Sequence, residues 1–238
     1  MEVKILFPPN KEIADLQATI CACAMRSTRT KGSAQELLKQ EWHWCEVTDV
    51  GIKRELCLRP ESKAKCQHRE NCIERMLWQA KQMKHWGVFE FADFTVSVSG
   101  VSRALTHQLV RHRLFSYLQQ SQRAVEIDIS KPWYVIPKTI RGTGLERVFE
   151  EYMKEIASWY NSFIHDYNVP DEDARFILPN ACFTDITISG NARNWLHFFK
   201  MRLDPHAQWE IRETATKILE EFMKLSPIIF EGAGELEV

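Results

Sequence analysis

Along the chain, apolar positions follow two periods, one typical of helices and one typical of strands. Apolar residues recur at three- and four-residue steps in eight segments, and this spacing predicts helices. Those segments lie near 11–25, 33–41, 70–85, 101–114, 143–166, 171–178, 190–203 and 206–224. Alternation at every second residue, or a short apolar run, predicts strands near 2–7, 46–57, 91–99 and 182–189. Because strands and long helices mix without a regular βαβ repeat, we predict an α+β fold with a central, mostly antiparallel sheet flanked by long helices.

Proline and glycine mark the ends of two of these elements. Pro205 suits the first turn of the last helix, and Pro227 ends that helix. In the strand FADFTVSVSG, apolar and hydroxyl residues alternate, and Gly100 is expected to end the strand. The apolar positions of the last helix are Ile211, Ala215, Ile218, Leu219, Phe222 and Leu225.

The charge balance argues against a polybasic coat protein for nucleic acid and against an acidic tail. The 238 residues contain 31 lysines and arginines and 32 acidic residues, which gives a formal net charge of -1. With 45% hydrophobic residues, the composition is that of an ordinary globular protein. We expect one domain, 1–238, and any site for an anion must be local.

No segment predicts a membrane anchor or a disulfide framework. The first apolar run is short and stops at Pro8, and no stretch approaches the roughly 20 apolar residues of a membrane span. Seven cysteines are an odd number, so we expect reduced thiols and a soluble, cytoplasmic protein. Neither GxGxxG nor GxxxxGK[ST] occurs, so side chains must hold any nucleotide that binds.

Two windows of the sequence contain cations but no carboxylate. The first runs from Phe94 to Val125 and the second from Ile186 to Leu203. A guanidinium can hold phosphate oxygens through two parallel hydrogen bonds, so the windows indicate a site for an external anion. Alternatively, each window is a solvated basic face whose cations pair with acids elsewhere in the fold. The cations are Arg103, His107, Arg111, His112, Arg113 and Arg123 in the first window, and Arg193, His197, Lys200 and Arg202 in the second.

Neutral polar residues in the first window favour a nucleotide over a bare phosphate. Ser116 and the run from Gln119 to Gln122 offer donors and acceptors for sugar hydroxyls or base edges. The stretch RHRLFSYLQQSQR, from Arg111 to Arg123, thus combines cations with neutral hydrogen-bonding groups. We interpret the triplet at its front as the end of a helix and its back as a loop that wraps the nucleotide.

Helical spacing divides the second window into three faces. At about 100° per residue, Arg193 and His197 share one face, and Asn191 and Arg202 share another. One helix could therefore contact two ligands, or two ends of one. Taken singly, His197 is more typical of a core histidine and Arg193 of a surface ion pair. The apolar face contains Leu196, Phe199 and Leu203.

These segments together resemble the flavin-dependent thymidylate synthases, whose signature is an RHR triplet followed by a serine- and glutamine-rich loop ending in S-x-R. Here the triplet is Arg111 to Arg113, and the loop ends with Ser121 and Arg123. The segments GVSRALTHQLVRHR, VPDEDARFILP and NARNWLHFFKMRLDPHAQWEIR match further parts of the family in the same order. The resemblance is strongest over 85–215 and less clear over 26–72.

The resemblance implies a homotetramer whose active sites combine residues of more than one subunit. It implies FAD as cofactor, with deoxyuridine monophosphate (dUMP), 5,10-methylenetetrahydrofolate and NADPH as substrates, and no nucleic-acid or membrane partner. The implied flavin contacts are Gly87, Arg111, His112, Arg113, Leu114, Gln119, Asn191, Ala192, Arg193 and His197. The implied nucleotide contacts are Gln108, Leu109, Val110, Arg111, Gln119, Gln120, Ser121, Gln122, Arg123, Arg175 and Arg202.

The chain departs from the family pattern at two places. In HWGVFEF, Gly87 stands where the family often has a serine or threonine that touches flavin, and Phe91 stands where it has a histidine. Ala124 replaces the tyrosine that commonly follows the last arginine of the motif. We therefore expect one side-chain contact to flavin to be missing, and the end of the loop to lack its usual anchor.

The implied reaction is the reductive methylation of uracil at C5, with Arg202 as the catalytic cation that stabilises an enolate-like ring. Flavin-free thymidylate synthases attack the ring with a cysteine, but no cysteine here lies in a matched motif, although Cys182 is close to the second window. Ser121 has no neighbouring base in the sequence pattern, so we expect it to bind rather than to attack.

Three other interpretations remain open at this point. The segment 43–72 contains cysteines and histidines, but their spacing is wider than in zinc knuckles, and we predict no metal. A nucleotide- or RNA-binding module could use the basic windows for phosphates and aromatic side chains for stacking. A flavin oxidoreductase could act on another pyrimidine nucleotide.

Overall fold

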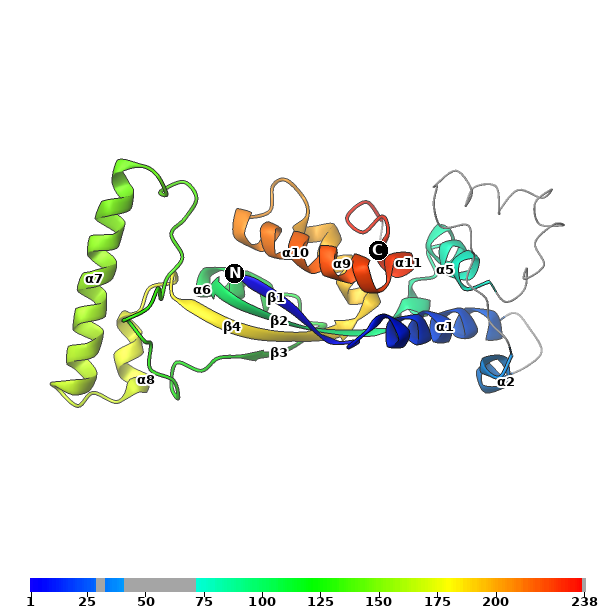
Figure 1. Cartoon of the computed structure of the whole chain (residues 1–238), viewed down its shortest axis with the longest axis horizontal. Coiled ribbons are helices and arrows are strands. Elements are labelled where there is room, and N and C mark those ends of the chain that lie inside the picture. Colours follow the sequence, from blue (N-terminus) through cyan, green and yellow to red (C-terminus); the bar gives the residue numbers. More distant parts are fainter. Residues whose placement is uncertain (29–32, 41–71, 237–238) are drawn as a thin grey trace. The chain divides into compact units, whose positions relative to one another are not determined.

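A computed structural model describes residues 1–28, 33–40 and 72–236 of the chain (Figure 1). Its strands are β1 (Glu2–Phe7), β2 (Asp93–Ser102), β3 (Ser116–Gln119) and β4 (Phe183–Asn191). Its helices are α1 (Lys11–Ser27), α2 (Ala34–Leu38), α5 (Ile73–Gln82), α6 (Arg103–Leu109), α7 (Gly144–His165), α8 (Asp171–Ala174), α9 (Ala192–Arg202), α10 (Trp209–Leu225) and α11 (Pro227–Phe230). Two short 3-10 helices are η1 (Trp86–Phe91) and η2 (Arg175–Ile177).

The four strands form one antiparallel sheet in the order β1-β2-β4-β3, which confirms the predicted α+β class. Two contacts set the register of β2 on β4. The hydroxyls of Thr95 and Ser189 lie 2.8 Å apart, and the backbone N–H of Gly100 donates to the carboxylate of Asp185 at 3.0 Å. The single-domain assignment stays a prediction, since the chain divides into two compact units.

The first unit contains 1–3 and 97–188, and therefore α6, β3, α7, α8 and η2. Within it, the long helix α7 packs against α8 and η2 (Figure 1). A small core joins Met153 and Ala157 of α7 to the buried side chains of Trp133 and Cys182. This small core fixes the segment that leads into β4 against the inner face of α7.

The second unit contains 4–96 and 189–238, with α1, α2, α5, η1, α9, α10 and α11. Its core is aromatic. The ring of Phe94 lies 4.8 Å from the rings of both Phe222 and Phe230, and Trp195 lies 5.1 Å from Phe222. The indole N–H of Trp195 donates to the backbone carbonyl of Phe94 at 3.1 Å, so this buried polar group has a partner.

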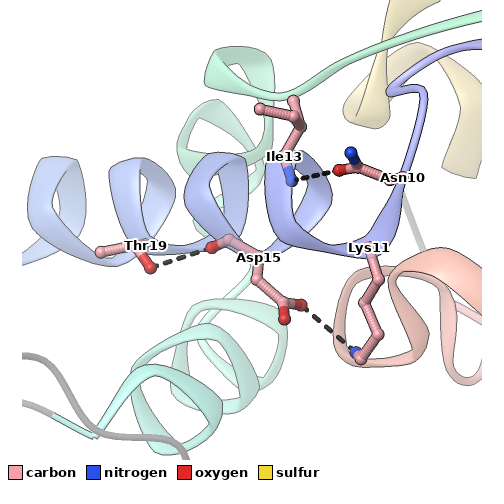
Figure 2. Close-up of polar contacts among 5 residues, drawn as sticks. All are labelled: Asn10, Lys11, Ile13, Asp15 and Thr19. Atoms are coloured by element: carbon pink, nitrogen blue, oxygen red, sulfur yellow. Dashed lines mark hydrogen bonds and ion pairs between the residues drawn. The ribbon is translucent and has the colours of Figure 1, made fainter.

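Helix α1 begins at a side-chain cap (Figure 2). The side-chain oxygen of Asn10 accepts from the backbone N–H of Ile13 at 3.0 Å, which satisfies one of the free donors of the first turn. Lys11 pairs with Asp15 one turn later at 3.3 Å, and the hydroxyl of Thr19 donates to the carbonyl of Asp15 at 2.9 Å. One face of the helix is buried, so its start sets the position of a core element.

Several element ends differ from the sequence prediction. The prediction that Gly100 ends its strand is wrong, because β2 continues to Ser102, with Gly100 at φ 68°, a conformation that glycine adopts without strain. Helix α10 begins only after Gln208, whose side chain caps it, so Pro205 lies ahead of the helix. The predicted segment 171–178 is split into α8 and η2.

Some elements were missed or lie outside the described residues. The short strand β3 was not predicted, and neither were η1 and α11. The predicted strand 46–57 falls outside the residues that the structure describes. Among the described helices, none is both long enough and apolar enough to cross a bilayer.

We predict that Asn10→Ala destabilises the protein by about 1 kcal/mol, because the first turn of α1 loses its side-chain acceptor. Chemical denaturation of both proteins measures this difference. Asn10→Ser, which restores an acceptor, is the matched control and should lie close to the wild type. Equal stability of the alanine and serine variants would show that the cap contributes nothing.

Candidate functional site

The RHR triplet follows helix α6 and is not part of it. The hydroxyl oxygen of Ser102 caps α6 by accepting from the N–H of Leu105 at 3.0 Å, and the helix ends at Leu109. The predicted helix 101–114 is therefore wrong at both ends. After Leu109 the chain turns tightly, with the N–H of Arg111 donating to the carbonyl of Gln108 at 3.2 Å. The triplet therefore lies in turns, where successive side chains point in different directions.

A tyrosine from β3 holds this turn. The hydroxyl of Tyr117 donates to the carbonyls of Leu109 and His112, at 2.7 and 2.9 Å. The ring of Phe115 is buried, with its centroid 6.1 Å from that of Tyr117 and 6.4 Å from that of His112. The backbone that carries the triplet is thus anchored at both its ends.

Arg111 and Arg113 project from this fixed backbone into solvent. Both side chains are exposed, and within residues 72–236 neither has an ion pair or a side-chain hydrogen bond. Leu114 beside them is 75% exposed, and Val110 is 40% exposed. Two cations held in place without counterions next to exposed apolar groups form a surface suited to an aromatic ligand that carries phosphate.

The last residue of β3, Gln119, and the first residue of the loop after it, Gln120, are both fixed by hydrogen bonds. The side-chain amide of Gln119 donates to the hydroxyl of Thr106 on α6 and to that of Thr184 on β4, both at 3.1 Å. The backbone N–H of Gln120 donates to the carbonyl of Asp185 at 2.9 Å. The amide N–H groups of Gln119 therefore face two buried threonines. These contacts, with that of Gln120, hold the start of the loop in place.

Arg103 also contacts the backbone of Gln120 at the start of the loop. Its guanidinium Nη2 donates to the carbonyl of Gln120 at 2.8 Å, while its backbone N–H donates to the carbonyl of Cys182 at 3.0 Å. Burial lowers the pKa of Arg103; Cys182 acts in the opposite direction, and the charge of Arg175 lowers the pKa again. Arg103 and Arg175 are therefore close enough to repel each other.

The tip of the loop closes on Ser121 without the tyrosine typical of the family pattern. The hydroxyl of Ser121 accepts from the N–H of Arg123 at 3.2 Å. Its backbone carbonyl accepts from Ala124 and Val125, at 3.3 and 3.0 Å. Ala124 offers only a methyl group in place of a tyrosine ring and hydroxyl, and backbone hydrogen bonds anchor the end of the loop instead.

Glu172 brings Arg123 and Arg175 together. Its carboxylate accepts from Arg123 at 3.0 and 3.2 Å, and its backbone carbonyl accepts from the Nε of Arg175 at 3.0 Å. The alternative of pairing with a distant acid therefore holds for Arg123, whereas among the described residues no acid pairs with Arg111 or Arg113. Both side chains of the Arg123–Glu172 pair are more than half exposed, so a phosphate can compete for Arg123 at little cost.

The remaining predicted residues belong to the second unit. The side chain of Asn191 caps α9 by accepting from the N–H of Asn194 at 3.0 Å, so Asn191 precedes the helix and shares no helical face with Arg202. The N–H of Ala192 donates to the carbonyl of Ala92 at 2.7 Å. Arg202 is half-buried in the last turn of α9.

One face of α9 is exposed and charged, as the spacing predicted. Arg193 forms a 2.5 Å ion pair with Glu90, which confirms the surface-pair alternative for this residue. His197 is exposed, so the core-histidine alternative is wrong. Leu196 and Phe199 are fully buried, which confirms the apolar face.

Gly87 lies at the wall of a cavity of about 500 Å³. A Cβ built on Gly87 would meet no atom within 4 Å, so the hydroxyl side chain of the family pattern is absent although there is room for it. Phe91, 57% exposed, lies on the same wall. The other lining residues are Ile20, Cys23, Ala24, Met25, Ser27, Thr28, Ala34, Leu38, His85 and Val88.

Sequence reasoning counted Arg103 among the cations of the first window but gave it no contact to the loop. It missed Tyr117 and Glu172 as residues that shape this region. Nothing near Glu172 in the sequence signals its pairing with Arg123, which is 49 residues away. The predicted residues from Gln108 to Arg123 gather with Arg175 in the first unit, and the others lie in the second.

Neither cysteine nor metal chemistry gains support from the described residues. Cys182 is fully buried, and burial raises the pKa of its thiol to about 12. Within residues 1–28, 33–40 and 72–236, no three side chains of histidine, cysteine or acid gather as metal ligands. Most of the segment 43–72 lies outside the described residues.

Comparisons with known proteins agree on one family. The family model described as "Thymidylate synthase complementing protein" matches residues 16–228. A flavin-dependent thymidylate synthase of Geobacter sulfurreducens is 46% identical over 163 residues, which cover 68% of this chain and 70% of the relative. The enzyme of Pyrococcus furiosus is 45% identical, with 67% and 68% covered, and that of Clostridium tetani is 36% identical, with 78% and 81% covered.

We predict that Cys182 resists alkylation in the folded protein at about pH 8, because its thiol is buried and protonated. Iodoacetamide treatment followed by peptide mass spectrometry measures the labelled fraction. The same treatment in denaturant is the control, and there Cys182 should be labelled fully. Rapid labelling of the native protein would show an accessible thiolate and reopen cysteine catalysis.

Proposed function

The chain belongs to the flavin-dependent thymidylate synthase family, and we propose that it performs the reductive methylation of dUMP to dTMP with the residues described above. The carbon comes from 5,10-methylenetetrahydrofolate, and NADPH is the reductant. The observation that carries the proposal is the turn that exposes Arg111 and Arg113, which no acid pairs with in the described part of the chain, together with Arg123 and Arg175 gathered at Glu172. These two groups of cations suit ligands that carry phosphate.

The residues present fit the binding of FAD. In the first unit, Arg111 and Arg113 supply positive charge that suits its phosphates. In the second unit, considered by itself, the cavity beside Gly87 has mostly apolar walls and a size typical of a ligand site. His112, Leu114, Asn191, Ala192, Arg193 and His197 are the further contacts that we propose. FAD, when bound, supplies the hydride for the new methyl group, and this chain's side chains position it and exclude water.

On the nucleotide side, Arg123 and Arg175 are proposed to hold the 5′-phosphate. The Arg123–Glu172 pair is exposed, so breaking it costs little. A dianionic phosphate in place of the carboxylate then presents more negative charge to Arg123. The backbone of the loop from Gln120 to Gln122 contacts the nucleotide, and Gln108 to Arg111 contribute from the turn after α6. Ser121 binds and does not attack, because its hydroxyl already accepts a backbone N–H and no base contacts it among the described residues.

Arg202 is proposed as the catalytic cation. Uracil C5 is a weak nucleophile until negative charge develops on the ring oxygens, and a fixed guanidinium near N3 and O4 stabilises that charge. Its half-buried position at the end of α9 limits the motion of the side chain. The charge then remains oriented while the ring reacts.

We further propose a homotetramer in the cytoplasm, with active sites that combine residues of several subunits. In such an assembly, the nucleotide residues of the first unit and the flavin residues of the second need not come from the same chain. The exposed apolar side chains beside the triplet, Leu114 and Leu118 at 75% and 79% exposure, are the kind that a partner subunit or a ligand covers.

Tritium release from [5-³H]dUMP is the decisive assay. We predict release that depends on both methylenetetrahydrofolate and NADPH, by a yellow protein that loses flavin on denaturation. No release by a flavin-loaded protein would favour an oxidoreductase acting on another pyrimidine nucleotide. A colourless protein whose RNA binding falls steeply with salt would favour the nucleic-acid module.

We predict that Arg202→Ala retains FAD and loses at least 100-fold in turnover, a loss typical of removing a group that stabilises transition-state charge. Flavin absorbance and tritium release measure the two properties separately. Lys224→Ala removes an exposed cation of the second unit and serves as the control, with wild-type behaviour expected. Wild-type turnover of Arg202→Ala would exclude Arg202 from the mechanism.

A further inference from the structure

We propose that Arg103 is a positioning residue for the nucleotide phosphate, acting through the backbone carbonyl of Gln120. The proposal rests on the proposed function, since it concerns the same nucleotide site. Arg103 does not lie in the loop or in the RHR triplet. Its guanidinium nevertheless contacts the one residue from which the tip of the loop extends.

The electrostatic environment of Arg103 is unfavourable without a ligand. Among the described residues, no carboxylate pairs with Arg103, and its buried Nε has no hydrogen-bond partner. The charge of Arg175 lies near enough to lower the pKa of Arg103. A half-buried cation beside another cation costs free energy in the empty protein. A dianionic ligand at Arg175 offsets this repulsion, so the cost falls when phosphate is bound.

The contacts around Gln120 explain how Arg103 acts at a distance. Gln120 donates its N–H to Asp185 on β4 and accepts from Arg103 on α6, so its peptide groups are fixed from both sides. Immediately after it, Ser121 to Arg123 form the turn that carries the phosphate-binding arginine. Without the guanidinium, the carbonyl of Gln120 is free to rotate, and the turn loses one of its two anchors.

The separate contacts of Gln119 make the loss selective. Gln119 remains held by Thr106 and Thr184, whose hydroxyls do not depend on Arg103. The sheet and α6 should therefore persist in a variant of Arg103, while the direction of the turn is no longer fixed. A purely structural residue would instead lower stability and flavin content together.

The test compares Arg103→Met, which keeps an unbranched side chain out to about the position of Nε but removes the charge and the donors, with the wild type. We expect FAD content and kcat at saturating dUMP to stay within about threefold, and the KM for dUMP to rise tenfold or more, as for the loss of one charge-assisted hydrogen bond. The inhibition constant of inorganic phosphate, used as a competitive inhibitor against dUMP, should rise by a similar factor. Arg141→Met removes an exposed cation of the same unit and should leave all four quantities unchanged.

Two results would overturn the proposal: an unchanged KM and phosphate inhibition in Arg103→Met, or a parallel loss of flavin and stability with no selective effect on phosphate. If Arg103→Met does not fold, Arg103→Lys decides. It retains charge without the planar donor group, so a KM raised roughly threefold or more supports the proposal, and an unchanged KM opposes it. Calorimetric titration of dUMP into the flavin-loaded protein gives the same comparison without turnover. Because the titration measures binding of dUMP and not its methylation, it tests the role of Arg103 even if the proposed reaction does not occur.

Discussion

The fixation of Gln119 and Gln120 between α6 and β4 is the constraint on which the proposed nucleotide site depends. Two buried threonines hold the side chain of Gln119, and β4 and Arg103 hold the backbone of Gln120. These contacts turn a short edge strand into a rigid base for the turn that ends with Arg123. Loops usually have more freedom, and a phosphate site on a free loop would lose affinity to the ordering of its own backbone.

The same elements also organise the charges. Tyr117 on β3 fixes the turn after α6, so the strand that carries the loop also anchors the RHR triplet. Arg111 and Arg113 are exposed and pair with no acid among the described residues, while Arg123 is held by an exposed carboxylate for which, in our proposal, phosphate is exchanged. The arrangement concentrates positive charge locally in a chain whose formal net charge is only -1. Such local fields favour the binding and orientation of small anions.

Particular elements show how far the sequence could lead. The strong periodicity of α10 and the alternation of β2 predicted both elements, because burial of one face is written into the sequence of each. The strand β3 was missed, since four residues with exposed Ser116 and Leu118 carry almost no periodic signal. For the site, the missing carboxylates indicated an anion, while the names of the ligands came from the family resemblance. The roles of the individual residues stay predictions.

By itself, the sequence determined the α+β class, most of the helices, and a surplus of arginines with no acid nearby in the chain. Only the tertiary structure decided which of these arginines pair with an acid from a distant part of the chain. Glu90 reaches Arg193 from 103 residues away and Glu172 reaches Arg123 from 49, whereas no described acid reaches Arg111 or Arg113. Secondary structure follows from neighbours along the chain, but ion pairing depends on distances in space, and those are set by how the elements pack.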